Sequence, residues 1–307
     1  MVCEYCKSEV TFERYAVKAS EYRGALDDYI STSNDTVLKV GGISYRLTAQ
    51  LATGHSSDVW LAARATRLSE RVVVKRLRNS EDAPLLQREQ QALLELEQSS
   101  AQGADYFATL LPQRVAFGQG VQQGDAPALA AVFREPIGFA HTLLHVQRAY
   151  PDGADPRHLV WIWRRVLELL SWVHRSGKVH GAVLPAHILL NARDHAARLL
   201  GWSCAARAGE SLSVASTADL DIYPQAVLKG APLAPRSDLC MAARSLLKIF
   251  GQRADTVPAH FPSDLARLLE REASGAGGDD AWQVSEEVSR AARAGFGSPK
   301  FVHLVLP

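Results

Sequence analysis

The sequence predicts an α+β protein of two lobes, in which a small antiparallel sheet with one helix precedes a mainly helical lobe. Two observations predict this order. Short apolar runs with β-branched residues, such as Val72-Val73-Val74, occupy the first part of the chain, and these side chains favour a pleated, half-buried sheet. After Gly138, apolar residues recur at the spacing of buried helices, most clearly from Leu159 to His174.

The first lobe is expected to have the order β-β-β-α-β-β. Its strands are predicted at 45–50, 58–62, 71–77, 114–117 and 129–133, and its helix at 84–98, where leucines recur among Glu and Gln. The helices of the second lobe are predicted at 159–174, 238–250, 265–272 and 282–293. Asp155-Pro156 is a start signal for the first of these, and Asp238 is placed to cap the second.

These patterns divide the chain into four parts. Residues 1–44 form an N-terminal extension with a Cys-x-x-Cys pair, 45–138 the first lobe, 139–300 the second lobe, and 301–307 a C-terminal tail. The tail alternates apolar and mixed residues like a short strand. We expect it either to pack back on the fold or to add to the sheet edge of another protein.

The composition excludes several classes of function. Lys and Arg number 34 against 33 Asp and Glu, so the formal net charge is +1 and no strong field attracts nucleic acid. Hydrophobic residues make up 47% of the chain, which excludes wholesale disorder. The first residues lack a signal-peptide pattern and no apolar run could cross a bilayer, so we expect a cytoplasmic protein that does not bind membranes.

Five segments follow one another in an order that points to a family. They are Leu51–Trp60, Val72–Lys75, the helix with Glu89, His180–Leu190 and Leu199–Ser203. Over residues 45–293 this order resembles the protein-kinase fold, and the chain is similar to divergent bacterial serine/threonine-kinase-like pseudokinases. The resemblance implies a bilobal protein-kinase-like fold, with a sheet N-lobe and a helical C-lobe.

The resemblance assigns nucleotide binding to the N-lobe. Lys75 matches the Lys that pairs with the nucleotide phosphates, and Glu89 matches the helix acid that holds it in place. Gly54 and Val59 are what remains of the phosphate-covering loop, in which two further glycines are replaced. Taken singly, Lys75 and Glu89 also fit a surface lysine and a solvated helix residue, and the loop also fits a plain β-turn.

The positions that carry the family's chemistry hold no catalytic group. The catalytic Asp falls on Ala182, the metal-binding Asn on His187, and the metal-binding Asp on Gly201. Alanine can neither orient nor deprotonate a hydroxyl, and loss of one group from a cooperative site costs on the order of 10³ or more in rate. Asp194 lies in a turn between two expected short strands, so we do not expect it to replace the lost ligands.

The scaffold positions are better preserved than the catalytic ones. Leu93, His180 and Trp202 match the residues whose side chains stack through both lobes of a kinase. Asp238 resembles the helix-capping Asp that braces the catalytic loop, and an ordinary helix cap is compatible with that role. The resemblance therefore implies a protein that has the kinase fold but does not catalyse phosphotransfer.

Cys3 and Cys6 have the spacing of half a zinc site. Zinc takes four ligands, and the other two cysteines, Cys204 and Cys240, lie far away in the C-lobe. Zinc shared between two chains would make a homodimer through this knuckle, and zinc shared with another protein would recruit a partner. A reduced thiol pair without metal is the alternative.

We therefore expect a catalytically inactive pseudokinase that acts as a scaffold or allosteric regulator of protein partners still to be identified, with ATP or another nucleotide bound without Mg²⁺. The alternative is an unconventional ATP-using transferase, a protein or small-molecule kinase or a nucleotidyl transferase, with Asp194, His187 and Glu89 as candidate ligands and base. A third hypothesis is a nucleotide-independent interaction module that uses the cysteine knuckle and the C-terminal strand.

Overall fold

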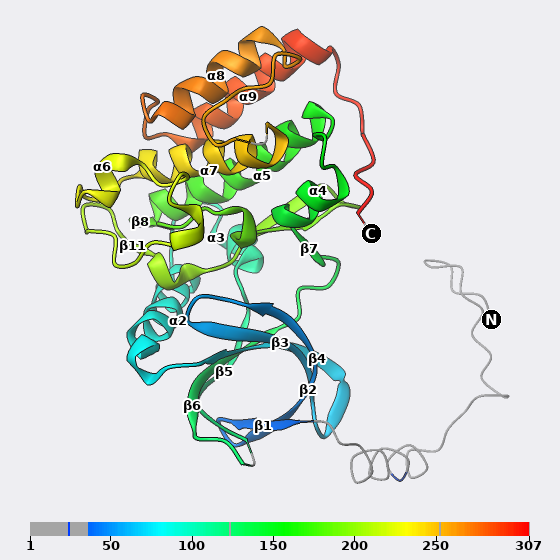
Figure 1. The fold of residues 1–307 in the computed structure, drawn as a ribbon, viewed down its shortest axis with the longest axis vertical. Coiled ribbons are helices and arrows are strands. Elements are labelled where there is room, and N and C mark those ends of the chain that lie inside the picture. The colour runs from blue at the N-terminus through cyan, green and yellow to red at the C-terminus, as the bar shows by residue number, and fades with distance from the viewer. Residues whose placement is uncertain (1–23, 25–35, 123, 252, 307) are drawn as a thin grey trace, which may run out of the picture.

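The computed structural model describes residues 24, 36–122, 124–251 and 253–306 and contains two lobes (Figure 1). The N-lobe strands are β1 (Val37–Val40), β2 (Ile43–Thr53), β3 (Ser57–Arg64), β4 (Arg67–Leu77), β5 (Arg114–Gln122) and β6 (Ala128–Arg134). They are neighbours in the order β1-β2-β3-β4-β6-β5, and β1 pairs antiparallel with both β2 and β5. The sheet is therefore a closed barrel, filled by Leu38, Val40, Tyr45, Leu47, Ala62, Val72, Val74, Ala130 and Val132.

The N-lobe begins earlier than the sequence predicts. Strand β1 and the first residues of β2 precede Tyr45, and Val37 already pairs with Arg46. The prediction that residues 1–44 form an extension is therefore wrong for residues 37–44. A strand of four residues is too short for an alternating pattern to stand out from the chain around it.

One long helix, α2 (Ala83–Glu97), packs against the outside of the barrel, as the sequence predicts. Its buried face includes Leu86, Leu93 and Leu96, which lie at helical spacing, and it also includes Glu89. Two short turns, α3 (Ala104–Phe107) and the 3₁₀ turn η2 (Ala108–Leu110), lead from this helix to β5. Helix α2 thus brings a carboxylate to the face of the sheet that meets the C-lobe.

The C-lobe is mainly helical, in agreement with the sequence. Its longer helices are α5 (Pro156–Arg175), α7 (Pro235–Phe250), α8 (Ser263–Ser274) and α9 (Ala281–Phe296). Its short elements are β7 (His141–Thr142), α4 (Leu143–Ala149), β8 (Lys178–Val179), η3 (Pro185–His187), β9 (Ile188–Asn191), β10 (Ala196–Leu199), η4 (Trp202–Cys204), β11 (Ala206–Arg207), η5 (Thr217–Asp219) and α6 (Gln225–Leu228). Strands β10, β9 and β7 form one small sheet, and β11 pairs with β8.

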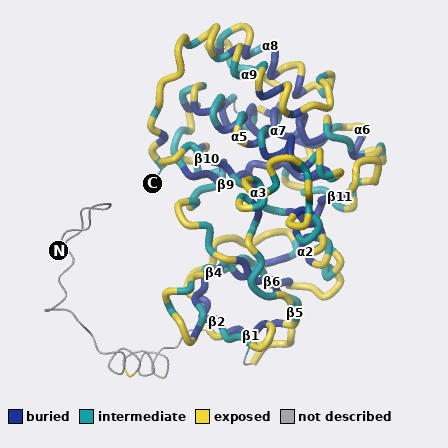
Figure 2. Tube along the Cα trace, turned by 180° about the vertical axis from the view of Figure 1, so that it is seen from behind, coloured by how far each residue is buried: buried dark blue, intermediate teal, exposed yellow. Residues whose placement is uncertain are grey.

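The main core lies around α5 and α7, each of which has a buried face (Figure 2). Trp163 and Trp172 of α5 are fully buried there, together with nearly the whole of α7. Among the described residues between α7 and α8, none is helical, which agrees with the short spacing seen in the sequence. Every helix in the described part of the chain is too short or too polar to span a bilayer.

The C-terminal tail packs back on the C-lobe instead of forming a strand. Leu304 is buried, the Phe301 ring stacks on His195 with centroids 4.0 Å apart, and the Val302 carbonyl accepts a hydrogen bond from His195 Nε2 at 2.9 Å. The Tyr150 hydroxyl donates to the Val305 carbonyl at 3.1 Å. The strand predicted from the alternating pattern is therefore absent over residues 297–306, and of the two roles expected for the tail the structure shows the first.

Candidate functional site

Lys75 and Glu89 form an ion pair between the barrel and α2. Lys75 lies on β4 opposite Val59 of β3 and Ala131 of β6, so the three side chains share the outer face of the sheet. Lys75 Nζ is 2.7 Å from Glu89 Oε2, and the two side chains are 18% and 4% exposed. Glu89 Oε1 accepts a hydrogen bond from the backbone N–H of Trp202 at 3.2 Å. One carboxylate therefore links the lysine of the N-lobe to the C-lobe.

The loop between β2 and β3 is a closed turn. The Gly54 N–H donates to the Ser57 carbonyl at 2.8 Å, so it already has a partner within the loop. The Arg78 guanidinium donates to the carbonyls of Gly54 and His55, and Arg78 also pairs with Asp58 at 3.2 Å. Sequence reasoning missed Arg78, which follows β4 outside any motif. The loop that covers phosphates in kinases is here tied to the end of β4.

The catalytic-loop segment is closely packed at Gly181 and buried at Ala182. Gly181 has φ +72°, and a Cβ there would stand 2.5 Å from the Cys204 carbonyl oxygen. Ala182 is 0% exposed. Its carbonyl accepts hydrogen bonds from His187 Nδ1 at 2.8 Å and from the Leu184 N–H at 2.9 Å. A carboxylate at position 182 would be buried in this segment, which holds no cation to pair with it.

His187 and Gly201 are packed directly against each other. Gly201 has φ +76°, and a Cβ on it would lie 2.5 to 2.6 Å from three atoms of the His187 imidazole. The ring therefore occupies the space in which a side chain at position 201 would start. Sequence reasoning treated the two positions separately, whereas in the structure they share one space.

Asp238 holds the catalytic-loop segment from below. Its carboxylate is completely buried and accepts hydrogen bonds from the His180 N–H at 2.7 Å, the Gly181 N–H at 2.8 Å and His174 Nε2 at 2.9 Å. The helix cap of α7 is Ala234, so Asp238 lies inside the first turn. The expectation that Asp238 is an ordinary cap is therefore wrong, and its contacts are those of a brace.

Two members of the predicted stack, His180 and Trp202, are in contact, and the third, Leu93, is buried. The His180 ring lies edge-on to Trp202 with centroids 4.5 Å apart, and Leu93 is fully buried on α2. His180 Nε2 donates to the Leu200 carbonyl at 3.0 Å, and Trp202 Nε1 donates to the Leu199 carbonyl at 2.9 Å. Burial lowers the pKa of His180 to about 4, so its imidazole is neutral at pH 7.

Comparison with known proteins was made at the levels of sequence and structure. No protein-family model matches the chain, and no curated protein matches it. Among solved structures, vaccinia related kinase 3 aligns with a TM-score of 0.59 at 15% identity, over 89% of this chain and 96% of the other. The BubR1 kinase domain aligns with a TM-score of 0.62 at 13% identity, over 89% and 93%. The chain has a protein-kinase-like fold.

The kinase resemblance assigns the catalytic Asp to Ala182 and the Mg²⁺ ligands to His187 and Gly201. Magnesium binds carboxylate and carbonyl oxygens in octahedral geometry, and Ala182, His187 and Gly201 offer no carboxylate. Within the described residues, no group of three His, Cys, Asp or Glu side chains could hold a metal ion. Asp194 accepts from Asn191 Nδ2 at 2.9 Å in the β9–β10 turn, at the far end of both strands from His187. Asp194 therefore lies apart from His187.

The predicted zinc ligands Cys3 and Cys6 lie outside the described residues, so zinc binding and a dimer through this knuckle stay predictions. Cys204 and Cys240 are free and buried, and burial raises the pKa of each thiol. A buried, protonated thiol is a poor metal ligand and a poor nucleophile. Neither cysteine of the C-lobe therefore adds chemistry to the site.

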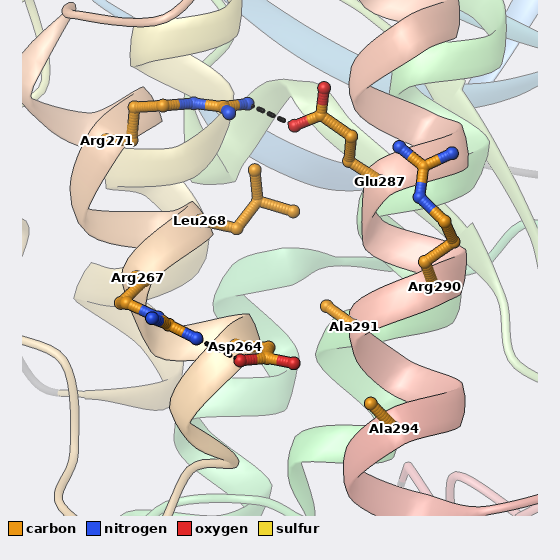
Figure 3. Close-up of a pocket in the computed structure, with 8 residues that line it drawn as sticks. All are labelled: Asp264, Arg267, Leu268, Arg271, Glu287, Arg290, Ala291 and Ala294. Atoms are coloured by element: carbon orange, nitrogen blue, oxygen red, sulfur yellow. Dashed lines mark hydrogen bonds and ion pairs between the residues drawn. The ribbon is translucent and has the colours of Figure 1, made fainter.

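A groove of about 460 Å³ lies between α8 and α9, away from the lobe interface (Figure 3). Leu268 forms part of its floor, Arg271 pairs with Glu287 at 2.6 Å, and Arg267 pairs with Asp264. Two arginines of the groove are thus paired with acidic side chains of the same groove, which neutralise their charge. The groove contains no arrangement of groups that points to a reaction.

Proposed function

We propose that the protein is a kinase-like scaffold or allosteric regulator that binds a nucleotide through Lys75 and Glu89 but does not transfer phosphate. One observation carries this proposal. The Lys75–Glu89 pair is formed at 2.7 Å, while Ala182 stands fully buried at the position of the catalytic Asp. Charge that can bind a phosphate is therefore present, and the group that would activate a hydroxyl is absent.

The geometry around Lys75 supports nucleotide binding without catalysis. Glu89 keeps the ammonium group oriented, as a short charge-assisted hydrogen bond does, and Val59 offers a half-buried apolar surface on the same face. The metal ligands are missing, so the nucleotide is bound without Mg²⁺. With no transfer step, the bound nucleotide acts on partners by changing the relative positions of the two lobes.

Calorimetric titration of the full chain with ATP tests this proposal, once with Mg²⁺ and once with chelator. We expect binding in chelator that Mg²⁺ does not tighten. Lys75→Ala should weaken binding by about tenfold or more, because one charge-assisted contact is worth about 1.5–3 kcal/mol. Lys178→Ala is the matched control, since it removes another Lys–Glu pair with α2, that of Lys178 and Glu95, outside the proposed site.

A phosphotransfer assay with labelled ATP completes the test. We expect no transfer to the protein itself or to added protein substrates above that of Lys75→Ala. Transfer that disappears in Lys75→Ala, or binding that requires Mg²⁺, would contradict the proposal and favour the unconventional transferase. Thermal unfolding of each variant shows whether a loss of binding reflects a loss of fold.

A further inference from the structure

The imidazole of His187 lies where the metal-binding groups of a kinase would converge. It fills the space beside Gly201, the position of the missing metal-binding Asp, and it stands on the catalytic-loop segment whose closing Asn it replaces. Both positions that would hold a cation for the phosphates therefore meet at one ring. An imidazole is the one side chain that gains a positive charge near physiological pH.

The hydrogen bond to Ala182 determines which nitrogen of this ring is available. A backbone carbonyl only accepts, so His187 Nδ1 carries the proton that is donated to Ala182 at 2.8 Å. In the neutral ring Nε2 is then a bare acceptor, and among the described residues no protein group donates to it. A phosphate oxygen is also an acceptor, so it can bond to Nε2 only after that nitrogen has taken up a proton.

Without a bound phosphate, the groups around His187 favour its neutral imidazole. Burial lowers the pKa of His187 first, its hydrogen bond to Ala182 raises it, and the Lys75 ammonium lowers it further. Glu89 and Asp219 raise it, but Glu89 is paired with Lys75, and Asp219 is paired with a lysine of α7 at 3.2 Å. The His180 ring, with its centroid 6.3 Å away, is itself neutral at pH 7.

We infer that His187 takes the place of the metal ion, and that nucleotide binding protonates its Nε2 so that the imidazolium donates to a phosphate oxygen. This inference rests on the nucleotide binding proposed above. One proton passes from solvent to Nε2, one N–H···O bond forms, and no covalent bond of the nucleotide breaks. Lys75 and His187 then supply two positive charges to the phosphates, in place of the one lysine and the metal ions of a kinase.

Titration with ATP in chelator at pH 6.0 and pH 8.0 tests the inference, with wild type and His187→Asn compared. The Asn amide can still donate to the Ala182 carbonyl but does not titrate. If only the imidazolium binds, the wild-type dissociation constant rises by up to about tenfold per pH unit beyond the change seen in His187→Asn. Subtracting the pH-dependent change seen in His187→Asn from that of wild type removes the contribution of the nucleotide's own titration.

Calorimetry in buffers of different ionisation enthalpy provides a second readout. We expect wild type to take up close to one more proton per bound nucleotide at pH 7.5 than His187→Asn. Equal proton uptake and equal pH response in the two proteins would overturn the role of His187 and leave the proposed nucleotide binding intact. Absence of binding to wild type at both pH values would instead contradict the proposed function. His187→Gln, checked by thermal unfolding, replaces His187→Asn if that variant does not fold.

Discussion

The two sides of the lobe interface differ in what they keep. On the N-lobe side, Lys75 and Glu89 form the short ion pair that a phosphate site needs. On the C-lobe side, the segment from His180 to His187 keeps its hydrogen bonds and its packing, but the catalytic position is a buried alanine. The N-lobe side presents a charged pair, and the C-lobe side presents a hydrogen-bonded loop without an acidic side chain at position 182.

This difference shows that the fold and the reaction depend on separate residues. The catalytic-loop segment is held by backbone donors to Asp238 and by the ring contact between His180 and Trp202. None of these contacts uses the groups that would move a proton or hold a metal. The loop therefore holds its shape without such groups, and the ring of His187 occupies the space beside Gly201.

The largest effect is expected from replacing Asp238, the residue that holds the catalytic-loop segment. Asp238→Ala leaves the buried N–H groups of His180 and Gly181 without partners, so we expect the free energy of unfolding to fall by about 3–5 kcal/mol. Denaturation by urea measures this change. Asp279→Ala is the control, because Asp279 pairs with the exposed Arg236 and its loss should cost about 1 kcal/mol or less. Similar losses in both variants would show that the brace does not carry the loop.

A smaller effect is expected from acid. The pKa of His180 is about 4 in the folded protein and near 6.5 in the unfolded chain, so the unfolded state binds more protons between these values. Its stabilising contribution is complete above about pH 6.5 and is lost as the pH falls toward 4, by about 1.4 kcal/mol per pH unit. Unfolding of wild type and His180→Phe at several pH values measures this slope. A constant offset between the two curves, without a difference in slope, would contradict the assignment.

The smallest effect concerns the contact between His187 and Gly201. Gly201→Ala should cost about 1–2 kcal/mol for the left-handed backbone and about 1–3 kcal/mol for the clash with the ring. In a His187→Ala background only the first cost remains. A double-mutant cycle measured by denaturation should therefore give a coupling of about 1–3 kcal/mol. Additive changes would mean that the two positions do not share one space.

Much of the kinase-like architecture could be predicted from residue patterns. The runs around Val73 and the helix with Glu89 predicted the sheet and α2, and the segment from Leu159 to His174 predicted α5. These elements are long or strongly patterned, so local preference and burial agree. The first strand escaped prediction, because four residues carry little pattern. The strand predicted for the tail is absent, because contacts with distant residues hold the tail on the C-lobe.

The sequence by itself determined the fold class, the order of the lobes and the absence of acidic groups at positions 182 and 201, since these follow from residue identity and periodicity. The resemblance to kinases also implied that Glu89 holds Lys75 and that Asp238 braces the catalytic-loop segment. Only the tertiary structure decided the geometry of these contacts, and that His187 fills the space beside Gly201. Such contacts join separate elements, and their distances depend on how those elements pack. No local pattern in the chain encodes that packing.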